Sequence, residues 1–365
     1  MLAIRAHAGS AAAHLDEIDI PELGPDDVLV RVAAAGISPG TLRVLEMGRF
    51  SHLPSTLGPD GAGTVVAVGP RVETIQVGER VRLHPNLNCR NCTYCRSDRD
   101  MMCPRLGIMG HGAFGRGPLP MYARYHDGAL AEYVRAPYWL IDRLPDNVSF
   151  EVGAKVNHLA TAARALCCAR IAPGATIVVT AATGSIGAAT VLLASTFGVA
   201  RMILVGRSAP ALRAVSTLSG GVTTDLVATE NLPGGWTATG GLATAVHNLV
   251  PIGADAVIDY IPTGPTGEQC LTAMATGGVF VHLGSNTAPA TWSMGTLMMN
   301  CWTVTGMRGA TRTDSDRILA VLGSGAVNAE ALITHRYPLR DSADAFAAQA
   351  ARRRDTPMWM VVAQP

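Results

Sequence analysis

The segment CRNCTYCRSDRDMMC, residues 89–103, places four cysteines close together in the chain. They follow the spacing C-x2-C-x2-C-x7-C and are Cys89, Cys92, Cys95 and Cys103. Cysteines at such short spacings are typical of a metal site, whereas the remaining cysteines are dispersed in apolar contexts that do not fit a disulfide framework. The cluster therefore predicts metal binding in a reducing compartment.

A second candidate site is the turn AATGSIG, residues 181–187, which follows the apolar stretch TIVVT. Gly184 and Gly187 stand where backbone N–H groups and a helix N-terminus must come close to a pyrophosphate, which requires small residues. Ala182 replaces the first glycine of the G-x-G-x-x-G pattern. Because a strand, the turn, a helix and a second strand follow in order, we expect a dinucleotide site. A plain connection without a ligand is the alternative.

The end of the second strand, ARMILVGRS, bears on the choice of cofactor. An acidic residue about 20 positions after the glycine turn would hydrogen-bond the ribose hydroxyls of NAD and repel a 2′-phosphate. Here Gly206 leaves room for that phosphate, and Arg207 and Ser208 can donate hydrogen bonds to it. The sequence therefore favours NADPH over NADH, the alternative being that Arg207 is simply an exposed residue at a strand end.

Two kinds of sequence pattern indicate the elements that must position these residues. Residues 26–145 contain short β-branched runs broken by glycine and proline, which predict a β-rich, barrel-like domain. Between about 155 and 300, six apolar strands alternate with helical stretches and predict a parallel, doubly wound sheet. After residue 310, a helical piece and a closing strand are expected to return to the first domain.

The predicted boundaries follow from these patterns. The first domain spans residues 1–155 and carries the metal lobe at 86–106, the second spans residues 156–305, and residues 306–365 return to the first. The segment between Cys103 and Gly128 has no clear period and predicts a long surface loop.

Composition restricts the classes of partner. The 365 residues are 48% hydrophobic and 16% charged with a formal net charge of +1, so the chain can bury a large core but has no basic footprint for nucleic acid. No stretch reaches about 18 apolar residues and no basic, apolar leader is present, so we expect no membrane span and a cytoplasmic location. Lys155, the only lysine among many arginines, indicates a compositional bias.

Six segments carry a family resemblance: AAAGISPG, LGPDGAGTVVAVG, the cysteine cluster, GALAEYV, the glycine turn and GGVFVHLG. Together they resemble the medium-chain dehydrogenase/reductase superfamily, which includes zinc alcohol dehydrogenases and quinone-reductase-like enzymes. The resemblance implies an α/β fold with a GroES-like β-rich catalytic domain and a Rossmann doubly wound parallel sheet. It also implies a homodimer or homotetramer and one structural Zn²⁺ on the four cysteines, in a closed thiolate site that leaves no position for a substrate.

The same resemblance implies that a second, catalytic zinc is absent. The family's three ligand positions match Ser38, Pro59 and Asn157 of this chain. Proline has no side-chain donor atom, serine and asparagine are poor zinc ligands, and the neighbouring Asp60 alone would not retain the metal. The active site is therefore more similar to the zinc-independent quinone-reductase branch, although that branch generally lacks the cysteine lobe.

Without a Lewis acid, hydride transfer favours substrates that are already electron-poor, such as a conjugated C=C bond, a quinone or an iminium ion. The alternatives are a ketone or aldehyde reductase that works without metal, and a non-redox cyclase, lyase or binding protein on the same fold. Ser38, Asp60 and Asn157 are candidates for positioning or polarising the substrate, or they simply fill the space of the missing metal. Candidate proton sources are His111, Tyr122, Tyr125 and His126.

The expected small-molecule cofactor is NADPH, and its binding residues follow from the motifs and the resemblance. They are Thr161, Gly184, Ser185, Ile186, Gly187, Gly206, Arg207, Ser208, Leu283 and Gly284.

Overall fold

A computed structural model describes residues 1–351 and 356–365, which fall into two compact units. Of the described residues, unit 1 contains 1–157, 310–351 and 360–365, and unit 2 contains 158–309 and 356–359. The first unit is therefore discontinuous in sequence, because the last part of the chain returns to it.

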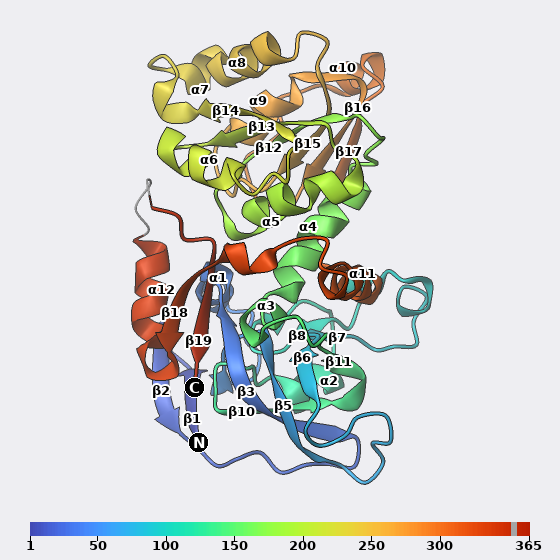
Figure 1. Cartoon of the computed structure of the whole chain (residues 1–365), viewed down its shortest axis with the longest axis vertical. Coiled ribbons are helices and arrows are strands. Elements are labelled where there is room, and N and C mark those ends of the chain that lie inside the picture. Colours follow the sequence, from blue (N-terminus) through green and yellow to red (C-terminus); the bar gives the residue numbers. More distant parts are fainter. Residues whose placement is uncertain (352–355) are drawn as a thin grey trace. The chain divides into compact units, whose positions relative to one another are not determined.

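Unit 1 is built on a seven-stranded sheet in the order β11-β6-β5-β3-β19-β18, with β10 also paired to β3 (Figure 1). The strands are β3 (Asp27–Ile37), β5 (Gly61–Val68), β6 (Arg80–Leu83), β10 (Tyr133–Pro137), β11 (Ile141–Arg143), β18 (Ile333–Pro338) and β19 (Met360–Gln364). A second sheet joins β2 (Ala13–Glu17), β1 (Leu2–Ala6) and β4 (Ser55–Thr56). Nearly all of β3 is buried, which makes it the central strand of the unit.

In the described parts of unit 1, the α-helices that accompany these sheets are α1 (Pro39–Glu46), α2 (Pro120–Tyr125), α3 (Phe150–Gly153), α11 (Arg312–Gly323) and α12 (Ser342–Ala350). Short 3-10 helices lie at Cys95–Ser97, Asp100–Met102, Tyr138–Leu140, Ala329–Leu332 and Leu339–Asp341. The returning chain is anchored by β19, which pairs antiparallel with β3 and parallel with β18. A capping box between Thr311 and Asp314 begins α11 and satisfies its first backbone N–H groups.

The segment after the cysteine cluster is not the long surface loop that the sequence predicts. It contains β8 (Gly107–Ile108), β9 (Gly112–Ala113) and α2, and β8 pairs with both β9 and β7 (Asn86–Leu87). Leu106, Met109 and Tyr122 are fully buried. The prediction was wrong because these elements are too short to show a period and are held in place by packing against the rest of unit 1.

Unit 2 contains a six-stranded sheet in the order β14-β13-β12-β15-β16-β17, with parallel pairing throughout (Figure 1). The six predicted strands and the doubly wound fold are thereby confirmed. The strands are β12 (Thr176–Val179), β13 (Arg201–Gly206), β14 (Thr223–Ala228), β15 (Ala254–Asp259), β16 (Met274–His282) and β17 (Thr303–Gly306). The middle strands are apolar and buried because helices cover both faces of a parallel sheet.

The α-helices of this unit are α4 (Val156–Cys168), α5 (Ser185–Leu193), α6 (Ala209–Ser216), α7 (Trp236–Thr239), α8 (Gly241–Leu249), α9 (Thr266–Leu271) and α10 (Met294–Met299). Two 3-10 helices lie at Ala194–Phe197 and Thr229–Asn231. Among residues 1–351 and 356–365, no helix has both the length and the apolar character needed to cross a bilayer.

Candidate functional site

The four predicted cysteine ligands come together in unit 1. All four sulfurs lie within 4.8 Å of one another. The Sγ atom of Cys95 is 3.5 Å from that of Cys92 and 3.9 Å from that of Cys89, close to the roughly 3.8 Å edge of a tetrahedron with zinc–sulfur bonds of about 2.3 Å. Backbone N–H groups of Cys89 and Arg105 donate to Cys103 Sγ, both at 3.4 Å. The arrangement fits a structural zinc with four thiolate ligands and no open position.

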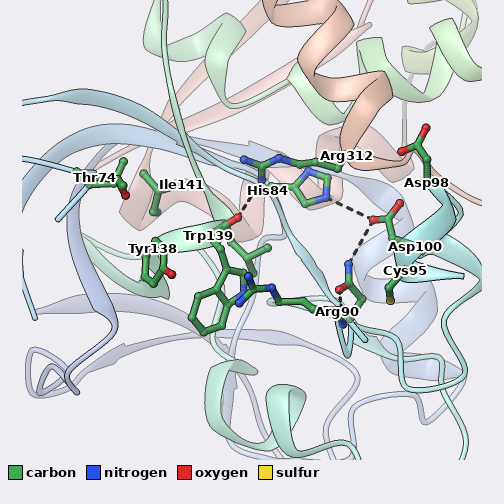
Figure 2. A pocket seen from close by; sticks show the side chains of 13 residues that line it. Thr74, His84, Arg90, Cys95, Asp98, Asp100, Tyr138, Trp139, Ile141 and Arg312 are labelled. Atoms are coloured by element: carbon green, nitrogen blue, oxygen red, sulfur yellow. Dashed lines mark hydrogen bonds and ion pairs between the residues drawn. The ribbon is translucent and has the colours of Figure 1, made fainter. Parts of the chain in front are cut away.

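A pocket of about 480 Å³ adjoins this cluster, and Cys95 lies in its wall (Figure 2). Its polar groups are largely paired with one another. Asn88 Nδ2 donates to Asp100 Oδ2 at 3.3 Å, and Arg312 Nη1 donates to the carbonyl oxygen of Trp139 at 3.1 Å (Figure 2). The first bond lies within the cysteine lobe and the second joins the start of α11 to the 3-10 helix Tyr138–Leu140, so we assign the pocket walls a supporting role.

The glycine turn follows β12 and leads into α5, as a dinucleotide site requires. A Cβ on Gly187 would lie 2.4 Å from the carbonyl oxygen of Ala181, so only glycine fits where the helix crosses the turn. Gly184 is the N-cap of α5 and offers no side chain to cap the helix. The buried hydroxyl of Ser185 has no hydrogen-bond partner among the described residues. Free donors at a helix N-terminus fit an incoming pyrophosphate.

The end of β13 shows a feature that the sequence did not predict. Arg207 is exposed, as the 2′-phosphate hypothesis requires, and Ser208 is buried as the N-cap of α6. The backbone N–H of Ala209, however, donates to Glu230 Oε1 at 2.7 Å. A carboxylate from the next strand connection therefore lies beside the arginine. A Cβ on Gly206 would lie 3.0 Å from Leu212 Cδ2, so the glycine also serves helix packing.

Leu283 and Gly284 follow β16 at the carboxyl edge of the sheet, where open α/β sheets bind ligands. A Cβ on Gly284 would lie 2.1 Å from the carbonyl oxygen of Ile261, so the backbone there has no room for a side chain. The preceding His282 is held by Asp259, whose Oδ2 lies 2.7 Å from Nδ1 of the ring. These contacts fix the backbone at Leu283 and Gly284, two of the predicted cofactor-binding residues.

In unit 1, Ser38 directly follows β3 and is the N-cap of α1, but its hydroxyl makes no capping hydrogen bond. A Cβ on Gly40 would lie 3.6 Å from Ser38 Oγ and 3.8 Å from His111 Cε1, so these two side chains flank the same space. His111 Nδ1 lies 3.3 Å from Thr41 Oγ1. Ser38, Thr41 and His111 thus form one polar cluster, and His111 stays a predicted proton source.

Asp60 lies next to a residue whose role the sequence analysis missed. Both Asp60 and Lys155 are buried, with exposed fractions of 3% and 1%. Lys155 Nζ donates to the carbonyl oxygen of Ile37 at 2.9 Å. A Cβ on Gly36 would lie 2.8 Å from Asp60 Cβ and 2.9 Å from Lys155 Nζ. Burial lowers the pKa of Lys155 to about 8, and the Asp60 carboxylate opposes that shift.

Asn157 and Thr161 lie on α4, four residues apart, and therefore share one face of the helix. Thr161 is buried and Asn157 is half-buried. Lys155 precedes Asn157 by two residues, so the same short segment carries the buried ammonium group and the candidate amide. This places two chemically different side chains at the start of α4.

The other predicted proton sources have structural contacts. Tyr125 donates its hydroxyl hydrogen to Asp27 Oδ1 at 2.6 Å, and both side chains are buried. Tyr122 is fully buried, and burial raises its pKa above the usual range. His126 Nδ1 lies 3.2 Å from Ser55 Oγ. These residues hold the segment after the cysteine cluster in place.

Two family models match most of the chain. Residues 24–146 match the alcohol dehydrogenase GroES-like domain, and residues 185–323 match the zinc-binding dehydrogenase domain. Among curated proteins, a probable D-xylulose reductase A from Neosartorya fischeri is 29% identical over 341 residues, which cover 90% of this chain and 87% of that protein.

The solved structures to which the chain is similar include dehydrogenases of the same kind. A putative zinc-binding dehydrogenase from Sinorhizobium meliloti 1021, bound to NADP, is 26% identical with a TM-score of 0.85 and covers 100% of this chain and 99% of its own. An NAD-dependent alcohol dehydrogenase is 27% identical with a TM-score of 0.83, and each chain is covered completely.

The crowded approach of α5 to its turn gives a testable prediction. We expect Gly187→Ala to destabilise the protein by about 1–3 kcal/mol and to weaken NADPH binding, because the new methyl group meets a backbone carbonyl that cannot move freely. Gly184→Ala is the matched control for the loss of stability alone, since its Cβ would meet the Ala181 carbonyl oxygen only at 3.2 Å. Thermal unfolding with and without NADPH measures both effects. Equal losses in the two variants would contradict the packing argument.

Proposed function

Because this chain belongs to the medium-chain dehydrogenase/reductase superfamily, we propose that it is an NADPH-dependent reductase of an activated double bond that works without catalytic zinc. The substrate class comprises conjugated C=C bonds, quinones and iminium ions. The chain is an oxidoreductase of this family, which disfavours a non-redox cyclase, lyase or binding protein on the same fold. From the family resemblance we also propose that the protein forms a homodimer or a homotetramer.

The observation that carries the substrate class is the set of residues at the family's three zinc-ligand positions. The family's ligand positions hold Ser38, Pro59 and Asn157, and these are not a zinc-ligand set. In the part of the chain that the structure describes, the four cysteines are the only group of three or more potential ligands placed to hold a metal. Hydroxyl and amide groups can donate hydrogen bonds to the oxygen of an enolate, whose charge is already delocalised.

Reduction of a ketone or aldehyde is the second candidate. The similarity to a protein named as a probable D-xylulose reductase favours it, because that name describes the reduction of a ketone. An isolated carbonyl forms a localised alkoxide, which demands more charge stabilisation than an enolate does. The two candidates therefore differ in how much positive charge the site must provide.

A substrate that carries both a conjugated C=C bond and a C=O bond distinguishes these two candidate functions. We expect the protein to oxidise NADPH with cyclohex-2-enone and to release cyclohexanone, the product of C=C reduction. Chromatography of the products identifies which bond was reduced. Cyclohex-2-enol as the sole product would contradict the first candidate and establish the second.

The neighbouring Arg207 and Glu230 generate a prediction about the cofactor. Arg207→Ala should raise KM for NADPH roughly tenfold and leave KM for NADH unchanged, because only the 2′-phosphate gains a charge-assisted hydrogen bond. Glu230→Gln should lower KM for NADPH about two- to fivefold, because it removes a negative charge near that phosphate. Steady-state kinetics with both cofactors measures these shifts. If Arg207→Ala affected the two cofactors equally, the preference for NADPH would be wrong.

A further inference from the structure

Lys155 is the only lysine in the chain, and unit 1 buries it almost completely. Lys155 lies two residues after the end of α3, and its side chain reaches the end of β3. There Nζ donates to the carbonyl oxygen of Ile37 at 2.9 Å. Gly36 lacks the Cβ that would lie 2.9 Å from Nζ. The end of β3 therefore leaves space for an ammonium group at the Ile37 carbonyl, one residue before Ser38.

The groups that face Lys155 come from several elements. Asp60, before β5, is the charged group that raises the pKa of Lys155 against the effect of burial. Gln349 on α12 is neutral and donates to the same Ile37 carbonyl at 3.4 Å. Glu151, on α3 and four residues before Lys155, is instead paired with Arg336 at 3.1 Å and is not among the charges that shift the pKa of Lys155. Asp60 is therefore the carboxylate whose charge the Lys155 ammonium group balances.

A second cation, Arg82 on β6, also interacts with Asp60, but its Nη2 lies 2.5 Å from Asp142 Oδ2 in a buried ion pair. Arg312 donates to the other oxygen of the Asp142 carboxylate. These contacts leave Lys155 as the cation next to Asp60 that can lose its proton near neutral pH, because an arginine stays protonated.

We propose that Lys155 is a positioning residue of the hydride-transfer centre: its ammonium group balances the charge of Asp60, so that negative charge can develop on a substrate held by Ser38 and Asn157. The inference rests on the proposed function. It assigns a role to a residue that has no place in the family's metal-ligand pattern, and it applies to both enolate and alkoxide products.

The step balances as follows. A hydride with its two electrons leaves C4 of NADPH and bonds to the electron-poor carbon, which oxidises NADPH to NADP⁺. In an enone, quinone, ketone or aldehyde the π electrons move onto the oxygen. Water then protonates the α-carbon of an enolate, or the oxygen of a phenolate or alkoxide, and leaves as hydroxide, whereas an iminium ion is neutralised by the hydride itself. A carboxylate at Asp60 opposes the charge that develops on this oxygen, whereas a protonated Lys155 offsets that opposition. When Lys155 loses its proton as the pH rises, the reduction slows.

Having a single lysine allows a direct test that needs no substrate. Protein labelled with [13Cε]lysine gives one lysine side-chain signal, and its titration reports Lys155 alone. We expect a midpoint near pH 8, in line with the lowered pKa of this buried group, and a lower midpoint in Asp60→Asn, which removes the opposing charge. A midpoint near that of a free lysine, or one unchanged by Asp60→Asn, would overturn the inference.

Kinetics supplies the second readout. The kcat for reduction should fall as the pH rises through about 8 in the wild type, and this limb should be absent up to pH 10 in Lys155→Arg, whose charge persists. Lys155→Met should lower kcat about 100-fold at pH 7 with KM for NADPH unchanged. The double variant Asp60→Asn/Lys155→Met should have a kcat about tenfold higher than that of Lys155→Met. Gln349→Ala, which removes only a neutral donor from the Ile37 carbonyl, should keep the wild-type pH profile.

The outcomes separate the two proposals. No NADPH oxidation by the wild type with enones, quinones, iminium ions, ketones or aldehydes would overturn the proposed function and the inference with it. Turnover with the same pH profile in the wild type and Lys155→Arg would overturn the inference alone and reduce Lys155 to a structural residue. If Lys155→Met does not fold, the wild-type titration and Lys155→Arg still decide.

Discussion

A buried ammonium group beside a buried carboxylate is the interaction on which this account depends. Removing two charges from water costs several kcal/mol for each ion, so the pair persists only where the surrounding backbone supplies hydrogen bonds and close packing. The end of β3 supplies both: Gly36 N donates to the carbonyl oxygen of Asp60 at 2.8 Å, and the Ile37 carbonyl accepts from Lys155. The C-terminal strand β19 pairs with Gly36 and Ile37, so the returning chain completes this arrangement.

Unit 2 brings backbone groups from distant parts of the sequence together at one edge of its sheet. Parallel pairing brings the carboxyl ends of β12, β13 and β16 to one edge of the sheet, and with them the glycine turn, Arg207 and Leu283. Gly184 leaves the N-terminus of α5 without a side-chain cap, and the Ser185 hydroxyl has no hydrogen-bond partner in the part of the chain that the structure describes, which fits a phosphate-bearing ligand. Glu230 lies at the same edge after β14, so an acidic and a basic side chain stand next to each other in the proposed cofactor site.

The sequence predicts most of the fold because its strands are long enough to show their periods. The six strands of unit 2 and the return of the chain at Met360–Gln364 follow from apolar runs between turn residues. The site was only partly predictable. Glu230 and Thr41 carry no sequence signal of their own, since their roles depend on which residues they face across the fold. Lys155 did carry a sequence signal, because it is the only lysine and lies two residues before Asn157. Only the packing of the fold showed that it is buried beside Asp60.

The central claim is that side chains, and not a second metal ion, provide the charge at the hydride-transfer centre. Zinc content per chain tests this most directly, measured by elemental analysis on active, chelator-washed protein. The account predicts about one zinc per chain, held by the four cysteines. About two per chain, with loss of activity when the second is removed, would contradict it and make zinc-assisted reduction of a ketone or aldehyde the better account.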